Sequence, residues 1–103
     1  MNFATSLFSR YMMQAYDLGI ETEKLVWEAV TFFREELDEQ VVPVAELAGN
    51  PDPLTVCCAT YEDKYANQWL FGLAMDDQSG GWLQGWVVRN GEIVHRNIPL
   101  ADD

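Results

Sequence analysis

The residues of this chain that could do chemistry are one histidine, two adjacent cysteines and two adjacent aspartates. His95 could act as a base for the thiol of Cys57 or Cys58, or it could work together with Asp76 and Asp77. A nucleophilic thiol needs such a base within hydrogen-bonding reach and a positively charged setting that lowers its pKa. The chain instead has 17 Asp and Glu against 6 Lys and Arg, a net charge of −11. We therefore expect a protein that is not an enzyme and has no catalytic residue.

Metal and cofactor sites are also poorly supported. The segment 76–81 offers oxygen ligands and glycines, but it lacks the alternating acids and the terminal Glu of a calcium loop. Two adjacent cysteines and a single histidine cannot supply the ligands of a structural zinc site. The sequence has no glycine-rich phosphate loop and no basic patch for direct nucleic-acid binding. We predict no metal, no cofactor and a polar hairpin loop at 76–81.

The clearest structural signal is the turn at Asn90-Gly91 between two apolar runs. Asn-Gly favours a type I′ hairpin turn, which fixes the register of the two strands that it joins. Counting outward from the turn pairs Val88 with Ile93 and places Trp86 opposite His95. Residues that lie opposite one another share a face. One face of this hairpin is then expected to present aromatic, amide and imidazole groups to a partner or a second copy: Trp82, Gln84, Trp86, His95 and Asn97.

Two helices are expected ahead of the strands. Apolar residues recur at helical spacing from about Phe3 to Leu18, and Gly19 is a natural stop. A second amphipathic pattern runs from about Thr22 to Gln40. Because only a few residues separate the two patterns, the helices should pack as an antiparallel hairpin.

The outer face of the second predicted helix is strongly acidic. Carboxylates placed three or four residues apart on a helix lie about 5–6 Å from one another. Several of them stand near the C-terminal end of the helix, where the helix dipole disfavours negative charge. We interpret the stripe as a solvated helix face or as a surface that binds a partner, and its residues are Glu21, Glu28, Glu35, Glu36, Asp38 and Glu39.

The predicted fold class is α+β, with an N-terminal antiparallel helical hairpin packed on a four-stranded antiparallel β-meander, in the order ααββββ. Residues 1–103 form a single domain: the helical hairpin at about 3–40, a connector at 41–53 and the meander at 54–98. If Met75 pairs with Trp82, then Trp69 and Phe71 share a face with Trp86. Two short helices cover only one face of this sheet. The other face would stay apolar and imply a homodimer or a partner, unless the connector covers it.

Location follows from what the sequence lacks. The first residues do not have the basic start and apolar core of a signal peptide, and the apolar runs are too short to cross a membrane. A disulfide between Cys57 and Cys58 would be strained, because neighbouring strand residues point to opposite faces. Two reduced thiols suit the cytoplasm, so we expect a cytoplasmic protein without a membrane partner.

Two hypotheses for function remain. In the first, the chain is a small acidic inhibitor or nucleic-acid mimic that docks on the basic surface of a nucleic-acid-handling protein. In type alone, this is similar to the anti-CRISPR and antirestriction proteins of phages and mobile elements. In the second, the chain is a homodimeric protein-binding module, like a secretion chaperone or an immunity protein, and binds through an apolar aromatic sheet face. The first predicts binding that weakens with salt, and the second predicts binding that resists it.

Overall fold

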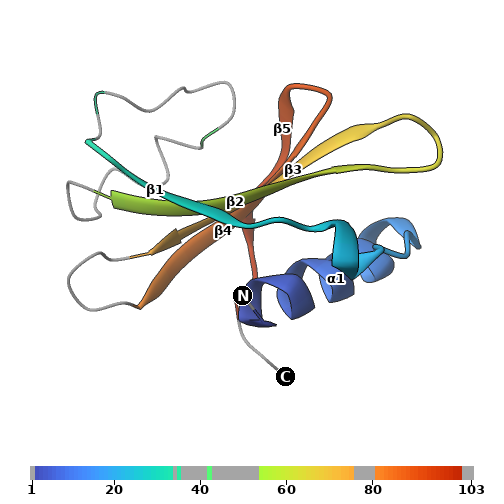
Figure 1. The fold of residues 1–103 in the computed structure, drawn as a ribbon, viewed down its shortest axis with the longest axis horizontal. Helices are drawn as coiled ribbons and strands as arrows, with labels where there is room; N and C mark the ends of the chain where they lie inside the picture. The colour runs from blue at the N-terminus through green and yellow to red at the C-terminus, as the bar shows by residue number, and fades with distance from the viewer. Residues whose placement is uncertain (1, 34, 36–41, 43–53, 76–80, 101–103) are drawn as a thin grey trace.

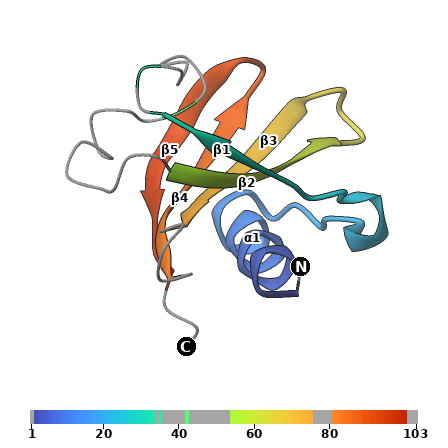
Figure 2. The same ribbon diagram turned by 60° about the vertical axis from the view of Figure 1, so that its left-hand side comes forward.

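The computed structural model describes residues 2–33, 35, 42, 54–75 and 81–100. Its elements are helix α1 (Asn2–Tyr16), a short 3-10 helix η1 (Thr22–Lys24) and the strands β1 (Glu28–Phe32), β2 (Leu54–Glu62), β3 (Gln68–Met75), β4 (Trp82–Arg89) and β5 (Glu92–Ile98). The strands form one antiparallel sheet in the order β1-β2-β3-β4-β5 (Figure 1). Helix α1 packs against one face of this sheet (Figure 2).

The predicted helical hairpin is wrong. One helix packs on five strands, and the segment assigned to the second helix forms η1 and then β1, which pairs with β2 from Glu28–Cys58 to Phe32–Leu54. The physical reason is the β-forming composition of residues 26–33, which are rich in valine, threonine and aromatic residues. Leu25 and Trp27, two positions apart, both pack on the core under α1. The acidic residues recur at helical spacing, but pairing with β2 makes this stretch a strand.

Helix α1 covers the first core of the molecule. Its buried residues are Ala4, Leu7, Phe8 and Met12, which recur at the spacing of one helical face. Phe8 stacks on Phe71 of β3, with ring centroids 5.1 Å apart. The helix ends before the glycine that the sequence suggested. Asp17 adopts a positive φ of 53°, and its N–H donates to the carbonyl of Met13 at 3.0 Å, as in the αL type of helix stop.

The hairpin turn is confirmed, whereas the register beyond it is not. Asn90 and Gly91 have φ values of 51° and 84°, as a type I′ turn requires. Val88 pairs with Ile93 as predicted, but a bulge then brings His95, rather than Val94, opposite Val87. A second irregularity follows between Val87 and Gly85. Each extra residue turns the following side chains to the other face of the sheet.

A bulge between β3 and β4 has a similar effect. Met75 does pair with Trp82, but the next pair is Ala74–Gln84, so that Gly72, rather than Phe71, lies opposite Trp86. Trp86 therefore leaves the face of Trp69 and Phe71 and joins a second core on the far side of the sheet. The buried members of this second core are Val42, Leu54, Val56, Ala74, Trp86 and Val88.

The far face of the sheet is thus buried around Trp86, which has 0% exposed surface. Val42, the one described residue of the predicted connector, packs in this second core. The other connector residues (41 and 43–53) and the predicted loop residues 76–80 lie outside the described residues.

Candidate functional site

The residues predicted to form one sheet face are divided between the two faces. Trp82 stacks on Phe3 of α1, with centroids 5.5 Å apart, and His95 also lies on the α1 side. Gln84 is buried and donates from Nε2 to the Arg96 carbonyl at 2.7 Å. Trp86 lies in the second core, and Asn97 is exposed. The structure therefore does not bring these residues together as a binding face.

The predicted acidic stripe is also divided. Glu21 lies between α1 and η1 and forms an ion pair with Lys24 at 2.5 Å. Glu28 begins β1, and both Glu28 and Glu35 are exposed. Glu36, Asp38 and Glu39 lie outside the described residues, as do Asp76 and Asp77. Glu21, Glu28 and Glu35 do not lie together on one helix, so the spacing argument for them fails.

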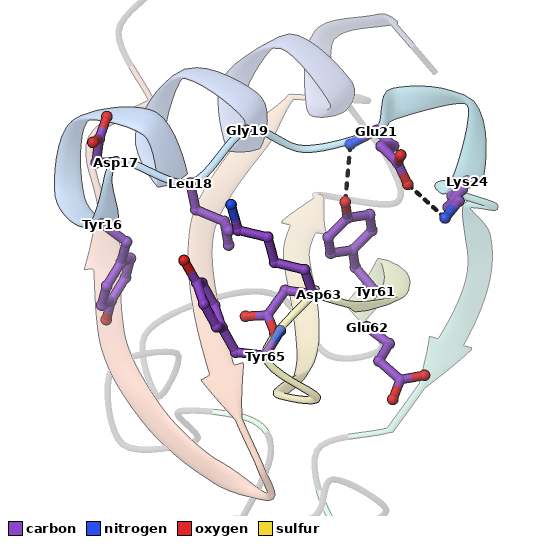
Figure 3. Close-up of a pocket in the computed structure, with 11 residues that line it drawn as sticks. Tyr16, Asp17, Leu18, Gly19, Glu21, Lys24, Tyr61, Glu62, Asp63 and Tyr65 are labelled. Carbon is purple, nitrogen blue, oxygen red and sulfur yellow. Dashed lines mark hydrogen bonds and ion pairs between the residues drawn. The ribbon is translucent and has the colours of Figure 1, made fainter.

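A different group of residues lines a cleft of about 760 Å³ (Figure 3). The chain that follows α1 forms one side of the cleft, and the hairpin joining β2 to β3 forms the other. The lining combines three tyrosines, four carboxylates and two lysines: Tyr16, Tyr61 and Tyr65; Asp17, Glu21, Glu62 and Asp63; Lys24 and Lys64. Except for Glu21, none of these residues was predicted to belong to a site.

Asp63 holds the hairpin side of the cleft in place. Its carboxylate accepts four hydrogen bonds of 2.8 to 3.1 Å, from the backbone N–H groups of Tyr65 and Asn67, the Asn67 side-chain amide and the Trp69 indole N–H. Burial alone would raise the pKa of Asp63, but these donors outweigh it and lower the pKa to about 2. The side chain is 8% exposed. Asp63 is therefore a structural anion that fixes Tyr65.

A hydrogen-bond network links this hairpin to the next one. The Asn67 side-chain carbonyl accepts from the Asn90 side-chain amide at 3.2 Å. Asn90 in turn accepts from the Gln68 N–H at 2.8 Å and donates its own N–H to the Gln68 carbonyl at 2.7 Å. The predicted turn residue thus also ties the β4–β5 turn to the base of the cleft hairpin.

On the opposite wall of the cleft, Tyr16 contacts His95, the only histidine in the chain. His95 Nδ1 lies 2.9 Å from the Tyr11 hydroxyl, and Nε2 lies 2.5 Å from the Tyr16 hydroxyl. A neutral imidazole satisfies both contacts, because one nitrogen donates and the other accepts. Burial, and to a lesser degree the charge of Arg89, lower the pKa of His95, whereas burial raises the pKa of Tyr11. His95 therefore positions Tyr16.

This arrangement predicts a pH dependence of stability. Because the folded-state pKa of His95 lies below its usual value of 6.5, the unfolded chain binds the proton more readily. The contribution of His95 to stability should be fully present above about pH 7.5. It should fall as the pH decreases through 6.5 towards the folded-state pKa. Thermal unfolding at several pH values between about 8 and 5 measures this slope. A His95→Gln variant should show a flat profile in this window, and an equally steep profile for that variant would contradict the assignment.

The surroundings of the two cysteines favour the protonated thiol. Cys57 is buried and Cys58 is half-buried, and both are free thiols. Burial is the main cause that raises both thiol pKa values, so the thiols stay protonated near neutral pH. Within the described part of the chain, no three His, Cys, Asp or Glu side chains are grouped so that they could hold a metal ion.

Some of the residues that line the cleft are exposed. The Tyr65 side chain is 69% exposed, and Asp17 and Glu62 are exposed carboxylates at the rim. Lys64 lies over the Tyr65 ring, with Nζ 5.3 Å from the ring centroid. The cleft therefore already holds a cation against an aromatic face, and the exposed carboxylates in its lining can pair with a second cation.

Sequence reasoning missed the cleft because its two walls are far apart in the chain. A local signal was present on one wall, where Asp63 and Asn67 have the side chains typical of an Asx-stabilised turn. No signal in the sequence placed this turn beside Asp17 and Glu21.

Comparison with protein-family models, with curated proteins and with solved structures gives no match. Among the described residues, no helix is long and apolar enough to cross a membrane.

Proposed function

We propose that this chain is a non-enzymatic acidic binding protein that holds a basic segment of a partner protein in the cleft between α1 and the β2–β3 hairpin. The observation that carries the proposal is a cleft of about 760 Å³ whose lining includes the exposed ring of Tyr65 and the exposed carboxylates of Asp17 and Glu62. Carboxylates pair with Arg and Lys, and an aromatic face attracts the same cations.

The charge of the whole chain supports this choice of partner. A net charge of −11 repels nucleic acid and attracts basic surfaces over several ångströms of water. The basic surfaces of nucleic-acid-handling proteins fit this description, and occupying one would inhibit it by displacing phosphates. The proposal includes a cytoplasmic location, where such proteins act.

The alternative hypothesis, a homodimeric module that binds through an aromatic sheet face, has less support. Trp86, which was expected on that face, has no exposed surface, and Trp82 is stacked on Phe3. Binding hot spots need aromatic groups that a partner can reach. Tyr65 satisfies this condition and lies in the acidic cleft.

The experiment is a titration of the protein against a dye-labelled peptide of alternating arginine and glycine, followed by fluorescence anisotropy. The double variant Asp17→Asn/Glu62→Gln should weaken binding about tenfold, since each exposed pair contributes up to about 1 kcal/mol. Tyr65→Ala should weaken it by about fivefold. Raising NaCl from about 50 mM to 500 mM should weaken wild-type binding strongly.

The matched control is Glu28→Gln/Glu92→Gln, which removes the same charge from exposed positions outside the cleft. It should change the affinity by less than about twofold. If both double variants weaken binding equally, the net charge alone attracts the peptide, and the cleft is not the site.

A further inference from the structure

The two edges of the sheet differ in a way that the cleft does not explain. β5 forms one edge and β1 the other. The β5 edge has two register irregularities and carries exposed polar residues, Glu92, Arg96 and Asn97. Bulges and charges of this kind protect an edge strand from pairing with another chain.

The centre of the β1 edge lacks these features. Its register with β2 is uninterrupted from Glu28 to Phe32, and the three central residues, Ala29, Val30 and Thr31, are uncharged and exposed. Val30 is 43% exposed, and the flanking Val26 and Phe33 are 71% and 54% exposed. Among the described strands, only β2 pairs with β1. An edge strand that is apolar, regular and uncharged at its centre is suited to pairing.

We infer that β1 pairs antiparallel with β1 of a second copy of this chain and joins the two sheets. A two-fold axis at Val30 would place Val30 opposite its own copy, Glu28 opposite Phe32 and Ala29 opposite Thr31. No like charges then face one another, so the strand is complementary to itself. Glu28 is the only charged residue in β1, and the remaining charge of each chain is screened over about 8 Å at physiological salt.

The size of the contact sets its strength. β1 has five residues, and a short strand pair buries less surface than the roughly 1,000 Å² of a stable interface. The dimer should therefore be weak and depend on concentration, with half association at roughly tens to hundreds of micromolar. The chain would be mostly monomeric when dilute and would pair when concentrated.

The test is sedimentation equilibrium of the protein alone, over roughly 10 to 500 µM. The average mass of the wild type should rise from that of a monomer towards twice that value. Val30→Lys places two like charges opposite each other and should weaken association about tenfold or more. Val26→Lys makes the same chemical change at a more exposed position outside the strand, and it should leave the dimer intact.

A mixing experiment tests the register. Val30→Lys and Val30→Glu should each be monomeric alone, and an equimolar mixture should associate because opposite charges then face each other. Circular dichroism confirms that each variant is folded before mixing. A wild type that stays monomeric up to the highest concentration overturns the inference. A dimer insensitive to Val30→Lys, or a mixture that fails to associate, also overturns it. None of these outcomes involves the cleft, so the proposed function is tested separately.

Discussion

Gly72→Ala should unfold this protein or reduce its free energy of unfolding by about 3 kcal/mol, a large overpacking penalty for one methyl group. A Cβ at residue 72 would lie 2.3 Å from Cε2 of Trp86 and within 2.6 Å of two further indole atoms. The Trp86 ring is fully buried in the second core and cannot retreat into solvent. The added methyl group must therefore displace the ring or the strand backbone.

Gly19→Ala is the matched control for this substitution. A Cβ at residue 19 would meet only the terminal methyl of Met13, at 3.8 Å, which is ordinary van der Waals contact. We expect its free energy of unfolding to stay within about 0.5 kcal/mol of the wild type. Urea unfolding of the three proteins, followed by tryptophan fluorescence, measures both differences. Equal stability of Gly72→Ala and the wild type would contradict the packing of Trp86 on β3.

Asp63→Asn should cost about 2–3 kcal/mol at neutral pH, because a neutral amide replaces the charged acceptor of four hydrogen bonds. The amide nitrogen also cannot accept from the Trp69 indole or the Asn67 amide. Since Asp63 fixes the backbone of Tyr65, the variant should also weaken binding in the cleft. Urea unfolding at pH 7 measures the loss of stability.

Acid should reduce the same contribution in the wild type. The folded-state pKa of Asp63 is about 2, below its usual value of 3.8. The stabilisation is therefore fully present above the unfolded-state pKa and is lost as the pH falls towards 2. The difference in free energy of unfolding between the wild type and Asp63→Asn should shrink over this pH range. The range lies well below the pH range in which His95 affects stability. Asp17→Asn, an exposed carboxylate in the same cleft, should not change stability, and an effect as large as that of Asp63→Asn would contradict the special role of Asp63.

Local signals in the sequence predicted local structure well. The apolar spacing in residues 3–16 and the Asn90-Gly91 turn each depend on nearby residues, and both features are present. The strands β2 to β5 also lie within the limits of the predicted meander, residues 54–98. These elements needed no knowledge of what packs against them.

Errors arose where a distant contact decides the structure. Val30 and Thr31 lie in a strand because β2 pairs with them, although the surrounding acids recur at helical spacing. Bulges in β4 and β5 carry no clear local signature, yet they move Trp86 and His95 to opposite faces. The cleft was not predicted for the same reason, because its two walls, at Tyr16 and Tyr65, are brought together only by the folded sheet.

The most direct test of the proposed function is a nuclear magnetic resonance titration with the arginine–glycine peptide at low salt. We predict that the largest amide shifts fall on residues 16–24 and 61–65, the two walls of the cleft. These amide signals should return to their positions in the peptide-free protein when salt is added. Shifts concentrated on β1 or β5, or small shifts spread evenly over the acidic residues, would contradict binding in the cleft.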